Sequence, residues 1–153
     1  MMGGTGSIEK GEAPMSGSLA ADPAGPAPVL TVILPALDEG RHIYANVLAV
    51  CAALKGIPSE VIVVDDGSRD DTLAEARRAQ AGGLPVRVLS DGRNRGKGGA
   101  LCWGVEVARG DRVAFLDADL ELAPENLLAM MELLDREQAD VAHARRPAVL
   151  DQL

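Results

Sequence analysis

The acidic residues that follow two apolar runs are the part of this sequence best suited to chemistry. Val113 to Leu116 leads directly into Asp117-Ala118-Asp119, and Val61 to Val64 leads into Asp65-Asp66. If the backbone stays extended, Asp117 and Asp119 point to the same side, because side chains alternate along a strand. Carboxylate oxygens are hard ligands that favour Mg²⁺ or Mn²⁺ over zinc. The pattern indicates a metal site that serves phosphate chemistry.

A pair of aspartates alone does not establish a metal site, since a solvated acidic turn that caps the next helix has the same pattern. An EF-hand calcium loop does not fit, because Glu121 and Leu122 stand where that loop needs Asp or Asn and then Gly. The two histidines, His42 and His143, lack the spacing of a zinc site. The metal site and the helix cap both stay open on this motif alone.

Asp65 and Asp66 end a strand in two adjacent carboxylates, which repel each other, so a turn alone does not account for both. Gly67 permits a tight turn, and Ser68 is suited to cap the following helix. In dinucleotide-binding folds an acidic residue in this place accepts hydrogen bonds from a ribose. This stretch is therefore a candidate for contact with a ribose or a base.

The stretch from Asn94 to Gly99 is similar to a phosphate loop, because glycines open a helix and Lys97 lies near its positive end. It is not a Walker sequence. Gly92 and Gly96 are separated by three residues, where the Walker sequence has four, and Gly98 stands where that sequence has Ser or Thr. No G-x-G-x-x-G motif follows the first strand, which removes the dehydrogenase fingerprint. A flexible basic surface loop is the alternative interpretation.

The acidic motifs and the phosphate loop have charge requirements that a cation reconciles. A carboxylate about 4 Å from a phosphate oxygen is repelled by about 4 kcal/mol at an effective dielectric near 20. Acidic residues and a diphosphate therefore share one crevice only with a cation between them. The metal and the nucleotide interpretations support each other.

From Val29 onward, short β-branched runs alternate with segments of helical period. This alternation is typical of an α/β fold, a Rossmann-like and mostly parallel sheet with helices on both faces. We expect strands at Val29–Leu34, Glu60–Val64, Val86–Leu89 and Arg112–Leu116, with a fifth around Val141. We expect helices around 43–54, 70–80 and 97–108, and a last one that begins near Pro124. All the motifs fall at the carboxyl ends of strands, where open α/β sheets bind ligands.

Three details of this arrangement can be checked directly. Pro35 is expected to stop the first strand, because proline cannot donate to a sheet ladder. The third helix is expected to bury Leu101, Val105 and Ala108 on one face. Gly110 is expected to supply the left-handed cap that ends this helix.

The composition fits one domain of 153 residues with a formal charge of -8. An acidic balance argues against a nucleic-acid partner, and 2% aromatic residues argue against base-stacking platforms. Cys51 and Cys102 lie in apolar, helix-like segments and are expected to be buried thiols in a reducing compartment. No apolar run approaches the roughly 20 residues that span a bilayer, and no signal-peptide pattern begins the chain. We expect a cytoplasmic location.

Taken together, four segments resemble the family 2 glycosyltransferases, most of all the branch of polyprenyl or dolichyl phosphate mannose and glucose synthases. The segments, in order, are Val32-Ile33-Leu34-Pro35-Ala36-Leu37-Asp38-Glu39, Val63-Val64-Asp65-Asp66-Gly67-Ser68, Asn94-Arg95-Gly96-Lys97-Gly98 and Asp117-Ala118-Asp119-Leu120. The similarity covers about Val29 to Pro147 in the right order and spacing. It divides the chain into a disordered leader (1–28), a donor-binding domain (29–147) and a C-terminal tail (148–153).

The resemblance implies a GT-A fold and inverting transfer of a sugar from a nucleoside diphosphate sugar to an acceptor, with polyprenyl phosphate as the suggested acceptor. It implies Mg²⁺ or Mn²⁺ on the diphosphate, held by Asp117 and Asp119, as Lewis-acid assistance to the leaving group. The nucleotide-binding residues that it implies are Pro35, Ala36, Glu39, Asp65, Asp66, Lys97 and Asp117. A lipid-linked acceptor implies a chain that works peripherally at a membrane.

The sequence departs from the family pattern at three places. Asp38 stands where the family usually has Asn, which adds negative charge near the donor. The segment from Asp140 to Arg146 replaces a DVVIGSR-like segment; it keeps Arg146 as a candidate phosphate contact and loses the Gly-Ser pair. The acceptor-binding half, which supplies the base in many members, is expected after this point, so no catalytic base is assigned.

Other functions fit parts of the same pattern. The chain is alternatively a nucleotide-sugar binding module without turnover, or one half of a two-chain enzyme with a membrane-associated partner. A nucleotidyltransferase of similar fold is a further alternative. Its glycine- and lysine-rich signature normally follows the first strand, where this chain has Pro35 to Glu39.

Overall fold

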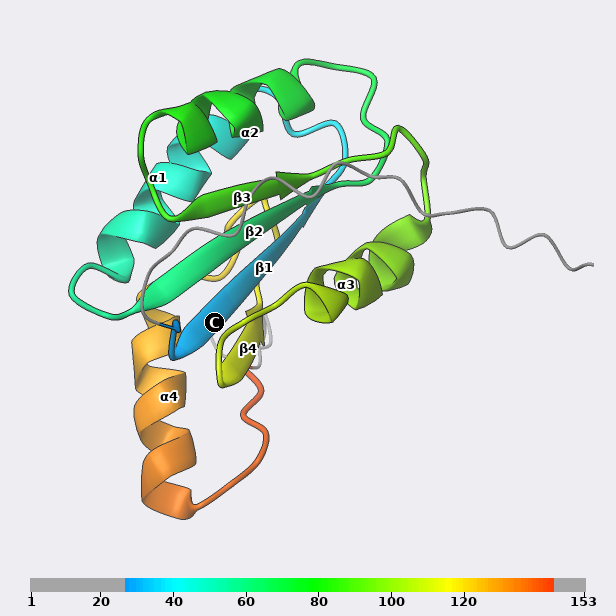
Figure 1. The fold of residues 1–153 in the computed structure, drawn as a ribbon. Helices are drawn as coiled ribbons and strands as arrows, with labels where there is room; N and C mark the ends of the chain where they lie inside the picture. The colour runs from blue at the N-terminus through cyan, green and yellow to red at the C-terminus, as the bar shows by residue number, and fades with distance from the viewer. Residues whose placement is uncertain (1–26, 145–153) are drawn as a thin grey trace, which may run out of the picture.

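The computed structural model describes residues 27–144, which form a parallel sheet with one helix after each strand (Figure 1). The elements are β1 (Leu30–Ala36), α1 (Ile43–Ala53), β2 (Ser59–Asp65), α2 (Thr72–Ala81), β3 (Val86–Leu89), α3 (Gly96–Glu106), β4 (Arg112–Phe115) and α4 (Asn126–Glu137). The α/β fold that the sequence predicts is confirmed. Arg146, the tail 148–153 and nearly all of the expected leader lie outside the described residues.

The four strands lie in the order β3-β2-β1-β4, and every neighbouring pair is parallel. The chain moves outward from β1 to β3 and then returns across the sheet to place β4 on the other side of β1. The strand order therefore reverses between β1 and β4, and a crevice opens there beyond the carboxyl ends of the strands. Both β1 and β4 end in predicted motifs at this point.

The two faces of the sheet are covered by different helices. On one face, α1, α2 and α4 pack against side chains such as Val32 and Leu34, and on the other face α3 packs against Ile33, Ile62 and Val64. Strands buried on both faces read as continuous apolar runs, as β1 and β2 do. None of the described helices is long and apolar enough to cross a membrane.

The helix α3 faces the sheet with smaller residues than the sequence predicts. Ala100 and Gly104 are buried, whereas Val105 is 44% exposed. A Cβ atom on Gly104 would lie 2.6 Å from Cγ2 of Ile33, so the close approach of helix to strand requires glycine here. Of the predicted core face, Leu101 and Ala108 are partly buried against the Ile33, Ile62 and Val64 cluster, whereas the prediction for Val105 is wrong, because Ala100 and Gly104 set the distance of the helix from the sheet. Cys102, on the same helix, is exposed and not buried as predicted.

Pro35 does not stop β1, which continues to Ala36. Ile33 accepts a hydrogen bond from the N–H group of Leu116 on the β4 side, so residue 35 faces the same side by alternation. The pairing of β1 with β4 ends at Ile33 and Phe115, and no strand lies beside Pro35 there. The missing N–H group therefore costs no ladder bond at this position.

Two other expectations about the second half of the chain are wrong. Gly110 does not adopt a left-handed conformation; a Cβ atom there would lie 2.5 Å from the backbone nitrogen of Thr31, so close contact explains the glycine. Residues 140–144 form no strand, and Val141 is 81% exposed. A strand needs a bonded neighbour, and this segment has none among the described residues.

Candidate nucleotide and metal site

A hollow of about 320 Å³ lies at the carboxyl edge of the sheet, between the ends of β1 and β4 and the start of α3. The residues that line it are Pro35, Ala36, Leu37, Glu39, Asp66, Asn94, Gly96, Lys97, Asp117, Ala118 and Asp119. All four sequence motifs contribute to this one hollow. Of the residues predicted to bind nucleotide or metal, Asp65 does not line it, and Arg146 lies outside the described residues.

The loop after β1 is held by a left-handed residue. Asp38 has φ 56°, a conformation that Asp and Asn tolerate better than most residues. Its carboxylate accepts the N–H group of Arg69 at 2.8 Å, and its own N–H group donates to the hydroxyl of Ser68 at 3.0 Å. Asp38 therefore joins two loops, and its carboxylate is not among the groups that line the hollow.

Two further bonds fasten the same pair of loops. The N–H group of Glu39 donates to the hydroxyl of Thr72 at 2.7 Å, and the N–H group of Gly40 donates to Asp70 Oδ2 at 2.9 Å. Hydrogen bonds from the hydroxyl and the N–H group of Thr72, together with the one from Gly40, hold the pKa of Asp70 below its ordinary value. Hydrogen bonds from the backbone N–H groups of Glu39 and Gly40 to side chains of the neighbouring loop thus set the position of Glu39.

The two acidic residues after β2 do different work. Asp65 is 2% exposed, and its two oxygens accept hydrogen bonds from the N–H group of Ser68 at 3.2 Å and the hydroxyl of Ser90 at 2.7 Å. Asp66 accepts the N–H group of Arg95 at 2.6 Å and also lines the hollow. Asp65 thus holds the turn, and contact between Asp65 and a ligand stays a prediction.

Gly67 allows the loop after β2 to meet the loop before α3. Its φ is 78°, and a Cβ atom there would lie 2.9 Å from the carbonyl carbon of Arg93 and from the nitrogen of Asn94. Glycine is the residue that satisfies both the positive φ and the close approach. The side chain of Asn94 in turn accepts the N–H group of Gly96 at 3.0 Å, where α3 begins.

The Asp117-Ala118-Asp119 segment is a turn and not an extended strand end. The N–H group of Leu120 donates to the carbonyl of Asp117 at 3.0 Å, and Leu120 has φ 52°. The amide of Asn46 on α1 donates to the carbonyl of Ala118 at 2.7 Å and anchors the turn. The extended geometry behind the prediction is wrong, although both aspartates line the hollow.

Lys97 is the one basic residue among those that line the hollow, and it faces four carboxylates there. It lies in the first turn of α3, and its ammonium group forms an ion pair with Asp117 Oδ1. The two side chains are 62% and 44% exposed, and an exposed pair of this kind contributes about 1 kcal/mol or less. A divalent cation that binds Asp117, or a phosphate that binds Lys97, can therefore separate the two side chains at a low cost in free energy.

The donor set fits a hard divalent cation that is shared with a phosphate ligand. Asp117 and Asp119 supply carboxylate oxygens, and one oxygen of Asp119 also accepts the N–H group of Glu121 at 3.1 Å. In the described part of the chain, no group of three or more His, Cys, Asp or Glu residues is arranged around a common metal position. Mg²⁺ in nucleotide sites usually takes one or two protein carboxylates and completes its shell with phosphates and waters. The arrangement suits a site of this kind, in which phosphates and waters complete the shell of the metal.

Five residues of this site were not among the predicted binding residues: Leu37, Asn94, Gly96 and Ala118 line the hollow, and Asn46 supports it. Leu37 lies in the first motif and is 46% exposed at the hollow. A leucine has no group that suggests binding, and its exposure cannot be read from the sequence. Asn46 holds the aspartate turn from 72 residues away in sequence, and no local pattern could indicate that contact.

The sheet order, the crevice at its reversal point and the helix that begins beside acidic residues define a Rossmann-like α/β domain. Residues 31–152 match glycosyl transferase family 2, and the chain belongs to this family. The predicted family is confirmed.

Relatives with assigned names include enzymes that act on polyprenyl phosphates. The chain is 35% identical over 115 residues to a dodecaprenyl-phosphate galacturonate synthase of Rhizobium johnstonii. The aligned region covers 73% of this chain and 34% of the relative. It is 31% identical over 124 residues to a dolichol-phosphate mannosyltransferase of Mycosarcoma maydis, which covers 77% of this chain and 42% of the relative. The chain thus spans well under half of the length of these curated relatives.

Among solved structures, a mannosyltransferase from Pyrobaculum calidifontis in complex with GDP-mannose and Mn²⁺ has the same fold. The TM-score is 0.61 at 30% sequence identity, and the match covers 76% of this chain and 35% of the neighbour. The described domain therefore has the GT-A fold of family 2 glycosyltransferases, and its relatives and structural neighbours are enzymes.

Proposed function

We propose that this chain is the donor-binding portion of a glycosyltransferase that moves a sugar, with inversion, from a nucleoside diphosphate sugar to an acceptor. The observation that carries the proposal is that four separate motifs line one hollow at the reversal point of the sheet. By this proposal, 29–147 is the donor-binding domain. The binding of GDP-mannose by the Pyrobaculum calidifontis neighbour supports a sugar nucleotide as the ligand class.

In this function, the end of β1 and the turn after β2 hold the nucleoside. Pro35, Ala36 and Glu39 line one side of the hollow, and Asp66 faces it from the neighbouring strand. Glu39 and Asp66 are suited to accept hydrogen bonds from ribose hydroxyl groups or from the base. Asp65 supports them by fixing the turn, and a direct contact between Asp65 and the base remains part of the proposal.

Asp117 and Asp119 would hold Mg²⁺ or Mn²⁺ on the diphosphate, a role supported by the Mn²⁺ in the Pyrobaculum calidifontis neighbour. When bound, the metal supplies Lewis-acid stabilisation of the charge on the departing nucleoside diphosphate. Lys97 would leave Asp117 and contact a phosphate oxygen near the positive end of α3. Without a metal, the four carboxylates would repel a diphosphate, because the single positive charge of Lys97 does not balance them.

We propose a polyprenyl phosphate as the acceptor, because the names of two relatives specify dodecaprenyl and dolichol phosphates. This acceptor would bring the enzyme to a membrane surface, and Arg146 remains a candidate contact for the acceptor phosphate. The catalytic base is not assigned to any residue of this chain. A nucleotide-sugar binding module without turnover is a second candidate, since the residues that line the hollow suit nucleotide and metal binding and none of them is assigned to activate an acceptor.

Calorimetry with GDP and UDP, each with and without Mn²⁺, tests the site. Asp119→Ala is expected to weaken the Mn²⁺-dependent binding of the nucleotide by about tenfold or more, because one of two carboxylate ligands is lost. Asp111→Ala, which removes an exposed aspartate at the opposite edge of the sheet, should bind like the parent chain. Equal affinity in Asp119→Ala and the parent would overturn the metal assignment.

A turnover assay separates the enzyme from the binding module. The chain is incubated with labelled GDP-mannose or UDP-glucose, Mn²⁺ and polyprenyl phosphate, and labelled lipid is measured. Sugar transfer above background refutes the binding module. Nucleotide binding without any transfer supports the module, or a chain that needs a partner for its acceptor site.

A further inference from the structure

Arg95, Gly99 and Trp103 form one column along the helix α3. Arg95 is the residue that immediately precedes the helix, and residues four apart on a helix are neighbours on one face. Helical side chains tilt toward the amino end of their helix, so Trp103 points back along the column toward Arg95. The guanidinium carbon of Arg95 lies over the indole ring of Trp103, 4.9 Å from the ring centroid. A cation over an aromatic face at this distance is attracted to it.

Gly99 leaves the room that this contact needs. A Cβ atom at Gly99 would lie 2.7 Å from Cβ of Arg95, which is the start of that side chain and not its flexible end. A side chain at position 99 would therefore push Arg95 out of the column. At Gly98, by comparison, no atom lies within 4 Å of an added Cβ atom. The path from Arg95 to Trp103 thus depends on the glycine at position 99.

The stack of Arg95 on Trp103 is fastened at both ends. Trp103 is partly buried against the core cluster between α3 and the sheet. The guanidinium of Arg95 also forms an ion pair with Asp91, and the N–H group of Arg93 donates to the same carboxylate at 3.1 Å. The side chain of Arg95 therefore connects the packed side of α3 to the loop that precedes this helix.

The backbone of Arg95 is the link to the candidate site. Its N–H group donates to Asp66 Oδ1 at 2.6 Å, a bond in which the acceptor carries a charge. Asp66 is 5% exposed and lines the hollow at the carboxyl edge of the sheet. A carboxylate with one oxygen held by a fixed donor faces the hollow in one orientation. The position of Arg95 therefore sets the orientation of Asp66.

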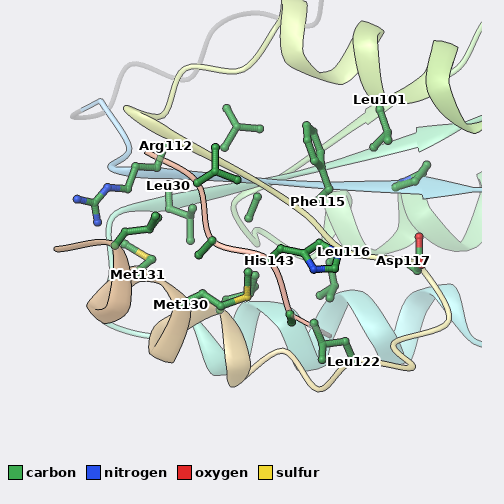
Figure 2. Close-up of a pocket in the computed structure, with 18 of the residues that line it drawn as sticks. Leu30, Leu101, Arg112, Phe115, Leu116, Asp117, Leu122, Met130, Met131 and His143 are labelled. Carbon is green, nitrogen blue, oxygen red and sulfur yellow. The ribbon is translucent and has the colours of Figure 1, made fainter. Parts of the chain in front are cut away.

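The opposite side of α3 belongs to a different surface. Leu101 lies two residues before Trp103, which places it roughly 200° away around the helix. It lines a groove of about 650 Å³ along β4, with Met130 and Met131 of α4 also in the groove wall (Figure 2). Trp103 is not among the residues that line this groove. The two sides of α3 can therefore be perturbed separately.

We propose that Arg95 and Trp103 are positioning residues for nucleotide binding. The stack of guanidinium on indole holds the backbone N–H group of Arg95 against Asp66 and thereby aims this carboxylate at the nucleoside. Neither Arg95 nor Trp103 is among the residues that line the hollow, so both act through Asp66 and not by touching the ligand. The contact of Asp66 with the nucleoside rests on the proposed function, whereas the stack and the backbone bond do not.

Calorimetry with GDP and UDP at saturating Mn²⁺ measures the effect on affinity. Arg95→Gln keeps the backbone N–H group but loses the stack, and it should weaken binding by about threefold, the scale of a partly exposed cation–π contact. Arg93→Gln removes the same charge from an exposed position in the same loop and should bind as the parent does. A loss that came from charge alone would be equal in the two variants.

Variants of Trp103 test the other half of the stack. Trp103→Leu should cause the same loss as Arg95→Gln, and the double variant should be no weaker than either, because both changes remove one contact. Trp103→Phe keeps an aromatic face and should recover most of the affinity. Leu101→Ala, on the opposite side of α3, should bind as the parent does. Far-ultraviolet circular dichroism verifies that each variant folds.

A double-mutant cycle shows whether the effect passes through Asp66. Asp66→Ala alone should weaken the binding of the nucleotide. In this background Arg95→Gln should cause no further loss, since no carboxylate remains for its N–H group to hold. A general loosening of the loop would weaken binding again.

Trp103 is the only tryptophan of the chain, so its fluorescence reports on the stack directly. Arg95→Gln and Gly99→Ala should both raise the quenching of Trp103 by acrylamide, because the ring is uncovered, whereas Gly98→Ala should not. Coupling between two contacts is reciprocal. Nucleotide bound with Mg²⁺, in place of the paramagnetic Mn²⁺, should therefore lower the quenching in the parent and not in Arg95→Gln.

The outcomes separate a failed positioning role from a failed proposed function. No binding of either nucleotide by the parent, or parental affinity in Asp66→Ala, would overturn the role of Asp66 and the positioning role with it. A loss in Asp66→Ala with parental affinity in Arg95→Gln would overturn the positioning role alone. Equal losses in Arg95→Gln and Arg93→Gln, or a further loss when Arg95→Gln is added to Asp66→Ala, would do the same.

Discussion

The two ends of the sheet both carry carboxylates, and their surroundings are opposite. At the amino end, Glu60 is 3% exposed and accepts the hydroxyl of Thr31 at 2.9 Å, the N–H group of Arg109 at 2.8 Å and the guanidinium of Arg87 at 3.3 Å. At the carboxyl end, Asp119 is exposed beside an open hollow, and one backbone N–H group donates to it. The carboxylate of Glu60 is enclosed by hydrogen-bond donors, whereas the carboxylate of Asp119 faces the open hollow.

The contrast separates a structural carboxylate from one that we propose to bind a ligand. Burial raises the pKa of Glu60, but hydrogen bonds from Arg109, Thr31 and Arg87 outweigh it and leave the pKa below its ordinary value. This carboxylate joins β1, β2 and β3 to the segment before β4. Asp117, by comparison, has a flexible and exposed lysine as its ion-pair partner, which a ligand can replace.

Among the changes proposed here, replacing Glu60 at the amino end of the sheet should cause the largest loss of stability. Glu60→Gln puts an amide against two arginines, and we expect a loss of about 3 kcal/mol in the free energy of unfolding, measured by urea denaturation. Glu106→Gln, at an exposed position on α3, should change stability by about 0.5 kcal/mol or less. Equal stability in the two variants would contradict the role of Glu60.

Gly67→Ala should disturb the carboxyl end by a smaller amount. A Cβ atom would sit 2.9 Å from the loop before α3, at a φ of 78°. We expect a loss of about 2 kcal/mol in stability and weaker binding of GDP or UDP with Mn²⁺. Gly83→Ala has the same φ of 78° with no atom within 4 Å of its Cβ, so it separates backbone strain from the clash. An equal loss in both variants would show that the contact with the loop is unimportant.

Acidification should weaken the amino end through Glu60. Its pKa is lowered from 4.5 in the folded chain, so its contribution to stability is present above pH 4.5 and is lost as the pH falls through the folded value. Urea denaturation of the parent between pH 6 and pH 3 should therefore show a steeper decline than the same series for Glu60→Gln. Parallel curves would mean that Glu60 titrates alike in the folded and unfolded chains.

The smallest effect on stability is expected at the site itself. Asp119→Asn removes one charge from a crowded acidic hollow while its side-chain oxygen can still accept the N–H group of Glu121. We expect a change of about 0.5 kcal/mol or less in the free energy of unfolding, against a clear loss of Mn²⁺-dependent nucleotide binding. A large loss of stability would place Asp119 in the same class as Glu60.

Features that depend on local pattern were predictable from the sequence. The strand at Val86–Leu89 has the predicted bounds, and the helix expected around 43–54 lies at Ile43–Ala53. The shared edge of the motifs followed from the parallel sheet, because parallel strands end on the same side.

Features that depend on contacts between distant residues were not predictable. The interior position of Asp65 arises from Ser90, 25 residues away, and the face of α3 depends on the space above Ile33. The expected strand around Val141 has the right composition, but strand formation requires a bonded neighbour that the sequence pattern cannot supply.

The position of β1 between β2 and β4 has a consequence for folding. The strands β1, β2 and β3 can associate early, whereas β4 closes against β1 across a long stretch of chain, as the bond from Gly110 to Thr31 across 79 residues shows. Closing such a long loop is slow compared with local pairing. During synthesis, the half of the site with Asp66 would therefore exist before Asp117 and Asp119 arrive. A nascent chain would gain all four carboxylates of the hollow only when β4 joins β1.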